Sequence, residues 1–145
     1  MTFVSVTRLR VRSLLYMPAF IWHTFKVIRQ AQGSPQFLGG RVLSEKRNAF
    51  WTATAWADQS AMLKFRQTGA HKVAMPKLLK WCDEASYVHW TQESREVPNW
   101  QEAHRRLVEE GKLSKVHHPS ADHQARHFVE PKPGRGQREL DPVNS

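Results

Sequence analysis

The chain has 145 residues, of which 40% are hydrophobic and 24% charged, and its formal net charge is +9. This length suits one domain with an extension, and the composition is that of a globular protein. No stretch approaches the roughly 18 to 20 uninterrupted apolar residues of a membrane span, which excludes stable membrane insertion. The single cysteine, Cys82, excludes an internal disulfide and predicts a cytoplasmic protein.

The positive charge is concentrated in the first two-thirds of the chain. Residues 1–92 hold 13 lysines and arginines against 4 acidic residues, whereas the remainder holds 9 of each. A basic domain attracts anions, which include nucleic acid, an anionic membrane surface and a small carboxylate or phosphate ligand. Charge alone leaves these alternatives open, together with a basic surface that has no specific partner.

The first elements are a strand and a long helix. Residues 3–11 alternate between two faces, as a half-buried strand does. Residues 13–32 repeat apolar side chains at helical spacing, and Gly33 ends that helix. Two strands over residues 37–44 and 50–56 follow, and the short polar turn between them predicts a hairpin.

A broken helix and a fourth strand complete the pattern. Asp58 is a suitable N-cap for the next helix, which Thr68-Gly69 interrupts before a second apolar stripe begins at His71. Residues 84–90 form the last strand. The order β-α-β-β-α-β predicts an α+β, ferredoxin-like sheet with two helices on one face. Because the other face would be open, we expect a homodimer in which a second copy covers it.

The last third of the chain differs in composition. A short helix is predicted from Pro98 to Glu110, and the chain from Glu130 onward has the composition of a disordered segment. We therefore divide the chain into a domain over residues 1–92, a C-terminal helix and extension over 93–129, and a disordered tail over 130–145.

Several pieces of the first domain resemble a known family. They are Phe37-Leu38-Gly39-Gly40-Arg41, Trp51-Thr52-Ala53-Thr54-Ala55-Trp56, Gly69-Ala70-His71 and Trp81-Cys82-Asp83-Glu84-Ala85-Ser86. Over about residues 3–92 the chain resembles the dimeric α+β barrel superfamily. Within it, the chain is most similar to antibiotic-biosynthesis monooxygenase-like proteins and to the branch that includes spheroidene monooxygenase.

The resemblance implies that an apolar or aromatic substrate is oxygenated, or haem is bound, in a cavity between the sheet and its helices. It implies either no cofactor, as in the antibiotic members, or haem. The haem-degrading branch uses an Asn, a Trp and a His. Here Thr7 and Phe65 stand near the first two positions and only His71 remains, so haem degradation is not expected.

His71 is the predicted catalytic residue, as a proton-handling base or an iron ligand. The alternative is a half-buried structural histidine. Trp51 and Trp56 have opposite parity on one strand, so one of them must face the helices. The residues predicted to line the substrate pocket are Trp51, Thr54, Trp56, Phe65, Met75 and His89.

Other chemistries lack their motifs. The tail histidines (His117, His118, His123 and His127) have no cysteine beside them and little expected order, so no metal site is predicted. No carboxylate pair, P-loop or nucleophile elbow is present. The paired aromatics of an RNA-binding sheet are also missing, which argues against a nucleic-acid partner.

The sequence thus favours a cytoplasmic homodimer that binds an apolar aromatic, polyene or haem-type ligand, with monooxygenase activity as the leading hypothesis. A non-catalytic small-molecule or haem-binding module of the same fold is the alternative.

Overall fold

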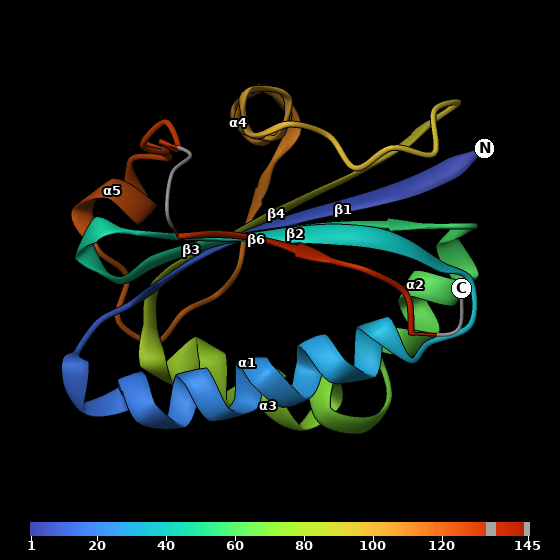
Figure 1. Cartoon of the computed structure of the whole chain (residues 1–145). Coiled ribbons are helices and arrows are strands. Elements are labelled where there is room, and N and C mark those ends of the chain that lie inside the picture. Colours follow the sequence, from blue (N-terminus) through green and yellow to red (C-terminus); the bar gives the residue numbers. More distant parts are fainter. Residues whose placement is uncertain (133–135, 144–145) are drawn as a thin grey trace.

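The computed structural model describes residues 1–132 and 136–143 and is built around one antiparallel sheet. The strand order is β5-β4-β1-β3-β2-β6, so β1 and β3 lie at the centre. Helices α1 and α3 cover one face, and α4 and α5 lie on the other (Figure 1). The strands are β1 (Thr2–Val11), β2 (Phe37–Glu45), β3 (Ala49–Trp56), β4 (Cys82–Gln92), β5 (Lys112–Leu113) and β6 (Gln137–Leu140).

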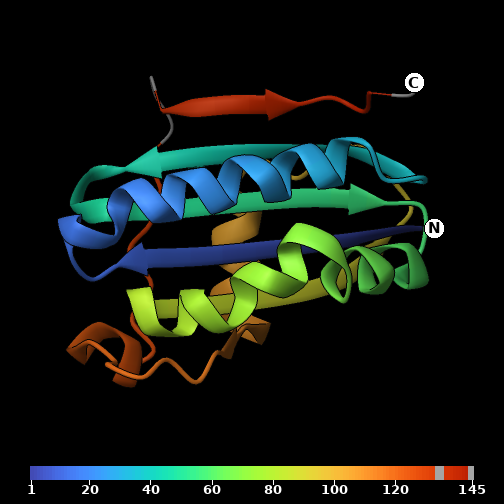
Figure 2. The same cartoon turned by 90° about the horizontal axis from the view of Figure 1, so that it is seen from below.

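The helices confirm the predicted β-α-β-β-α-β order, with further elements after β4. They are α1 (Met17–Gln32), α2 (Gln59–Arg66), α3 (Gly69–Trp81), α4 (Trp100–Glu110) and α5 (Ala121–Gln124), with 3-10 turns η1 (Leu14–Tyr16) and η2 (Lys46–Asn48). Figure 2 shows α1 and α3 lying side by side along the strands. Asp58 caps α2, since its carboxylate accepts a hydrogen bond of 2.8 Å from the Ala61 amide.

On the helix side of the sheet, two groups of apolar residues hold α1, α2 and α3. Trp56 packs with Phe37 and Met62 toward one end, and Val11 packs with Phe20 toward the other. The segment between α2 and α3 turns at Gly69, whose φ of +60° suits glycine better than any residue with a Cβ. This break separates two helices where the sequence predicted one interrupted helix.

The opposite face is covered by the chain itself, which corrects our expectation of an open face. Helix α4 places Trp100, Ala103 and Leu107 against Trp51 and Trp90 of the sheet, and all five are buried. The sequence of residues 93–129 predicts a helix but does not show which surface that helix packs against. For that reason we expected this face of the sheet to be uncovered. The homodimer stays a prediction, but an uncovered sheet no longer supports it.

Part of the predicted disordered tail is also ordered. Strand β6 pairs antiparallel with β2, in the register Gly40 to Leu140, and only 2% of Leu140 is exposed. The expected disorder is therefore wrong for residues 137–140, whereas 133–135 and 144–145 lie outside the described residues. Composition missed this strand because one apolar residue and the free edge of β2 are enough to hold it.

Over the residues that the structure describes, no helix is both long enough and apolar enough to cross a membrane.

Candidate functional site

The start of α3 is fixed by a side chain of α1. The Gln30 amide nitrogen donates hydrogen bonds of 3.0 Å to the Phe65 carbonyl and 2.9 Å to the Thr68 carbonyl. Its amide oxygen accepts a hydrogen bond of 2.8 Å from the His71 backbone N–H. One glutamine thus ties the end of α2, the turn at Gly69 and the first turn of α3 together, and so determines where His71 lies.

The His71 side chain is at the end of a row of aromatic rings. Its ring centroid lies 4.8 Å from that of Phe65 in an edge-to-face arrangement, and Phe65 lies 5.0 Å from Trp56. The His71 Nδ1 atom is buried and has no hydrogen-bond partner among the described residues. A buried nitrogen without a partner is costly, which makes it a candidate for an interaction with a ligand.

Burial also sets the charge of His71. It lowers the pKa of the imidazole below the ordinary value of 6.5, and the Arg66 backbone partly offsets that effect. The imidazole is therefore neutral near pH 7. A neutral imidazole with a free ring nitrogen can accept a proton, as a general base must.

Polar side chains of the central strands face the same helices. Ser5 and Thr7 of β1 and Thr52 of β3 share this face with Trp56 and are only partly buried. Since β1 has strands on both sides and helices in front, partial exposure there means that α1 and α3 do not seal the middle of the sheet. Water or a ligand can reach these hydroxyl groups.

His89 of β4 contributes to this region from the far side of β1. Its ring centroid lies 5.4 Å from Phe3 and 5.3 Å from Tyr87. Burial lowers its pKa below 6.5, and the charge of Arg66 lowers it further. The same arginine lowers the pKa of His71. Arg66 is therefore a cation close to both histidines.

A third histidine on this side, His23, is not among the predicted site residues. The Nδ1 atom of His23 on α1 is buried without a partner in the described part of the chain, and its ring lies 5.5 Å from Trp81. Burial again lowers its pKa. The helical spacing of residues 13–32 shows that His23 lies next to the apolar positions of this helix. It does not show that His23 packs on Trp81.

The predicted site residues divide between three places. Trp56, Thr54, Phe65, His71 and His89 lie on the helix side of the sheet. In this set Trp56 and Thr54 are buried, and the Thr54 hydroxyl accepts a hydrogen bond of 3.0 Å from the Trp56 indole. Thr54 therefore orients Trp56 more than it offers a surface to a ligand.

Two predicted pocket residues lie elsewhere. Trp51 is on the α4 side, because its parity on β3 is opposite to that of Trp56. Its indole donates a hydrogen bond of 2.8 Å to Glu45 and its ring packs near Trp100. Met75 follows the buried Ala74 on α3 and is 36% exposed on the outer surface. Neither can line a pocket between the sheet and the helices.

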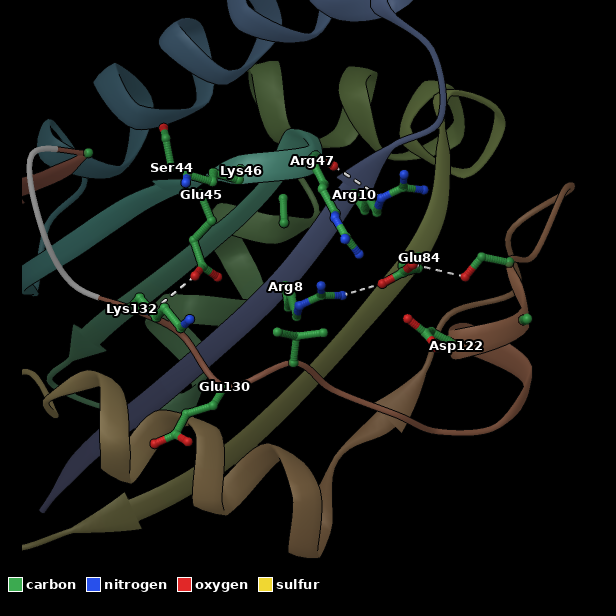
Figure 3. A pocket seen from close by; sticks show the side chains of 15 residues that line it. Arg8, Arg10, Ser44, Glu45, Lys46, Arg47, Glu84, Asp122, Glu130 and Lys132 are labelled. Carbon is green, nitrogen blue, oxygen red and sulfur yellow. Dashed lines mark hydrogen bonds and ion pairs between the residues drawn. The ribbon is translucent and has the colours of Figure 1, made fainter.

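A hollow of about 620 Å³ lies on the α4 side, between the sheet and the extension (Figure 3). Arg8 and Arg10 of β1 point into it, and Glu84 of β4 lies opposite Arg8 (Figure 3). Arg8 Nη1 and Glu84 form a buried ion pair of 2.6 Å, and the Ser120 hydroxyl donates to the other Glu84 oxygen at 2.9 Å. Glu45 similarly accepts a 2.9 Å hydrogen bond from the Lys132 backbone.

These bonds give the hollow a structural role. Ser120 and Lys132 belong to the extension, so Glu84 and Glu45 each join the sheet to it. The buried Arg8 and Glu84 side chains form an ion pair with each other, although Arg8 Nε has no partner in the described ranges. A space lined mainly by charged and polar side chains does not suit an apolar ligand.

Metal and thiol chemistry find little support in the described residues. No three His, Cys, Asp or Glu side chains there are grouped as metal ligands would be. His123 of the extension is buried and accepts a 3.4 Å hydrogen bond from the Ala85 amide. Burial raises the pKa of Cys82 to about 12, so its thiol stays protonated and unreactive.

Comparison with known proteins supports the fold. No family model matches the sequence, and no curated protein matches it. Among solved structures, a variant of SnoaB, a cofactor-independent oxygenase from Streptomyces nogalater, matches with a TM-score of 0.54 and 16% identity. The match covers 64% of this chain and 94% of that one.

Two further structures bear names of the same kind. A protein from Nitrosomonas europaea, named for antibiotic-biosynthesis monooxygenases, has a TM-score of 0.56 and 15% identity, over 63% of this chain and 90% of its own. One from Bacteroides thetaiotaomicron, similarly named, has a TM-score of 0.57 and 15% identity, over 68% and 95%. At these identities the likeness establishes the fold, the ferredoxin-like α+β fold of such monooxygenases.

Proposed function

We propose that this protein binds an apolar aromatic or polyene compound between the sheet and helices α1 and α3, and oxygenates it without a bound cofactor. The observation that carries the proposal is the buried, unpartnered Nδ1 of the neutral His71 imidazole, beside aromatic rings and on the same side of the sheet as partly exposed hydroxyl groups. The fold is shared with proteins named as monooxygenases, one of them a cofactor-independent oxygenase. That likeness supports the proposal.

The chemistry requires one base and an electron-rich substrate. His71 removes a proton from the substrate, and the resulting anion reacts directly with dioxygen. If a CH₂ group is converted to a carbonyl, one oxygen atom enters the product and the other leaves as water, so no external reductant is needed. The Arg66 charge favours the anion, and Phe65, with the buried Trp56 packed behind it, provides an apolar wall for the ring system.

Haem fits the site poorly. A haem iron bound at His71 would need a free ring nitrogen, which Nδ1 offers, and an open space for the macrocycle beside it. The Phe65 ring occupies the immediate neighbourhood, at 4.8 Å from the imidazole. The macrocycle could enter only if Phe65 and the junction at Gln30 moved. We therefore propose chemistry that uses the side chains alone.

The alternative function is a non-catalytic binding module with the same ligand site. Phe65, supported by Trp56, would bind a ring compound equally well in that case, and His71 would only donate or accept a hydrogen bond. The two alternatives differ in one observable, which is whether dioxygen is consumed when the ligand is bound. An absorbance spectrum of the purified protein tests haem separately, because bound haem gives a Soret band.

The decisive experiment is oxygen uptake with an electron-rich tricyclic phenol. We expect turnover by His71→Ala to be lower than that of the wild type by about 10²-fold or more, which is the usual effect of removing a general base. The matched control is His127→Ala, because that imidazole is exposed and lies in the extension. If the ligand binds to all three proteins and none consumes oxygen, the protein is a binder and the oxygenase proposal fails.

A further inference from the structure

The outer surface of α1 carries large apolar side chains that nothing in the described structure covers. They begin in η1 and continue along the helix at spacings of three and four residues. We call them the α1 stripe: Leu14 (72% exposed), Leu15 (87%), Ile21 (56%), Trp22 (59%) and Phe25 (45%). The inner side of the same helix, at Phe20 and Ala31, is already buried against the sheet. The stripe is therefore in excess of what the fold needs.

The helices of this layer have basic residues and no acidic ones. Within α1, α2 and α3 there are seven lysines and arginines and neither aspartate nor glutamate. The seven are Lys26, Arg29, Lys64, Arg66, Lys72, Lys77 and Lys80. Since α1 and α3 lie side by side (Figure 2), this charge and the α1 stripe belong to the same layer of the molecule.

Basic and aromatic side chains are in direct contact on α1. Lys26 Nζ lies 5.6 Å from the centre of the Trp22 ring, and the Arg29 guanidinium lies 5.6 Å from that of Phe25. Both pairs are within the range of a cation–π interaction. The surface is thus one patch in which apolar rings and positive charges are mixed, rather than two separate patches.

The opposite side of the molecule has a different charge pattern. Helix α4 carries Glu102, Glu109 and Glu110, and these acids form ion pairs with Arg105 and Arg106 on the same helix. Its exposed side is therefore largely neutralised. The sheet thus separates a basic, apolar helical layer from the side on which α4 carries mostly paired charges (Figure 1).

We propose that the α1 face is a docking surface for an anionic lipid bilayer. Basic residues beside exposed tryptophan and phenylalanine on a helix are suited to this contact. The apolar side chains enter the boundary between headgroups and acyl chains, and the bases meet lipid phosphates. The contact is peripheral, because no described helix is long and apolar enough to span a bilayer.

The charge and chemistry of the α1 face argue against the other occupants. A second copy would place one acid-free basic helical layer against another, and the like charges would repel. A nucleic acid would match the bases but would leave the α1 stripe without apolar contacts, since its outer surface is a row of phosphates. A bilayer with anionic lipids is complementary to both the charge and the apolar side chains.

Docking would also bring the proposed ligand site to the membrane, and this part of the inference rests on the proposed function. Ser5 and Thr7 lie on the sheet face that α1 and α3 cover, so a docked protein holds its ligand site on the side of the molecule that faces the phase in which apolar rings and polyenes dissolve. The docking itself does not depend on turnover. Vesicle binding and oxygen uptake can therefore fail independently.

The test is sedimentation of the full-length protein with two kinds of vesicle. One is phosphatidylcholine alone, and the other contains phosphatidylglycerol as well. We expect binding to the second kind only, and weaker binding as salt is raised. The variant Trp22→Gln/Phe25→Gln should lose most of this binding, whereas the matched control Val108→Gln, at a 49% exposed position on α4, should keep it.

A second pair of variants tests the charge. Lys77→Glu on α3 should weaken binding about 25-fold, because each unit of charge near the surface contributes about fivefold. Lys132→Glu changes the net charge by the same amount on the other face and should have a small effect. Circular dichroism melting curves check that each variant is folded, which is expected at exposed positions.

Three results would overturn the proposal. The first is no sedimentation of the folded wild-type protein with anionic vesicles. The second is equal weakening by the α1-face variants and their controls, which would mean attraction by net charge alone. The third is a drop in the mass of the wild-type assembly when Trp22 and Phe25 are changed, which would assign the stripe to a second copy of the chain.

Discussion

The two faces of the sheet use the same strands for different purposes. On the α4 side, Trp51, Ala53 and Leu107 are completely buried in one continuous apolar core. On the α1 and α3 side, Thr7 and Thr52 remain partly exposed at the centre of the sheet. On that side the Nδ1 atoms of His23 and His71 also have no partner among the described residues. The first face stabilises the fold, and the second leaves polar groups available to a ligand.

The largest effect in this comparison is expected at Trp100. Changing Trp100→Ala removes the largest buried side chain of α4, at the start of the helix, from its contact with Trp51 and should lower the free energy of unfolding by about 3 to 5 kcal/mol. Urea unfolding measures it. Val108→Ala, on the exposed side of the same helix, is the control. A loss below about 1 kcal/mol at Trp100 would mean that α4 does not stabilise the sheet.

The tail strand should have the next largest effect. Leu140 packs with Phe37 and Trp56, so Leu140→Ala should cost about 2 to 5 kcal/mol in the same assay. Val143→Ala, at a position that is mostly exposed, should change stability little. Equal stability of both variants would mean that the tail does not pack on the domain, as its composition predicts.

Gln30 tests how the helix side is held together. Gln30→Ala removes three hydrogen bonds to the segment from Phe65 to His71 and should cost about 1 to 3 kcal/mol. It should also reduce oxygen uptake, because His71 loses the contact that fixes its backbone. Gln32→Ala, which removes a single hydrogen bond to the Asp141 carbonyl, is the control. Unchanged turnover in Gln30→Ala would show that His71 needs no such support.

The smallest expected effect is the pH dependence of stability. Burial lowers the pKa of His71 and of His89 below 6.5, so the unfolded chain binds protons first as the pH falls. Stability should therefore be complete above about pH 6.5 and decline below it. His71→Gln should decline less steeply, because only His89 and His23 still contribute. An identical slope would mean that His71 is not buried in solution.

The sequence predicted the helix side well because its signals are local. The cap at Asp58, the break at Gly69 and the alternation of β3 each follow from a few neighbouring residues, and together they place His71 and Trp56 on the same side. The error at Met75 is one of phase, since the inward position of α3 is the adjacent Ala74. A one-residue shift in a helix turns a side chain by about 100°.

The other face could not be predicted from local pattern. Trp51 and Trp90 were visible as large side chains that needed a cover, but nothing near them in sequence shows that α4 provides it. Likewise, Arg8 interrupts an apolar strand, and only the fold brings Glu84 to it across 76 positions of sequence. Long-range contacts of this kind depend on the completed topology.

The most direct test of the account uses two neighbouring residues that face opposite ways. Thr52 faces α1 and α3, and Ala53 faces α4, so their methyl groups report on the two sides of one strand. In a methyl NMR titration with an electron-rich tricyclic phenol, the account predicts shifts at Thr7 and Thr52 and none at Val6 and Ala53. Shifts at Val6 and Ala53 with Thr7 and Thr52 unchanged would place the ligand under α4 and contradict it.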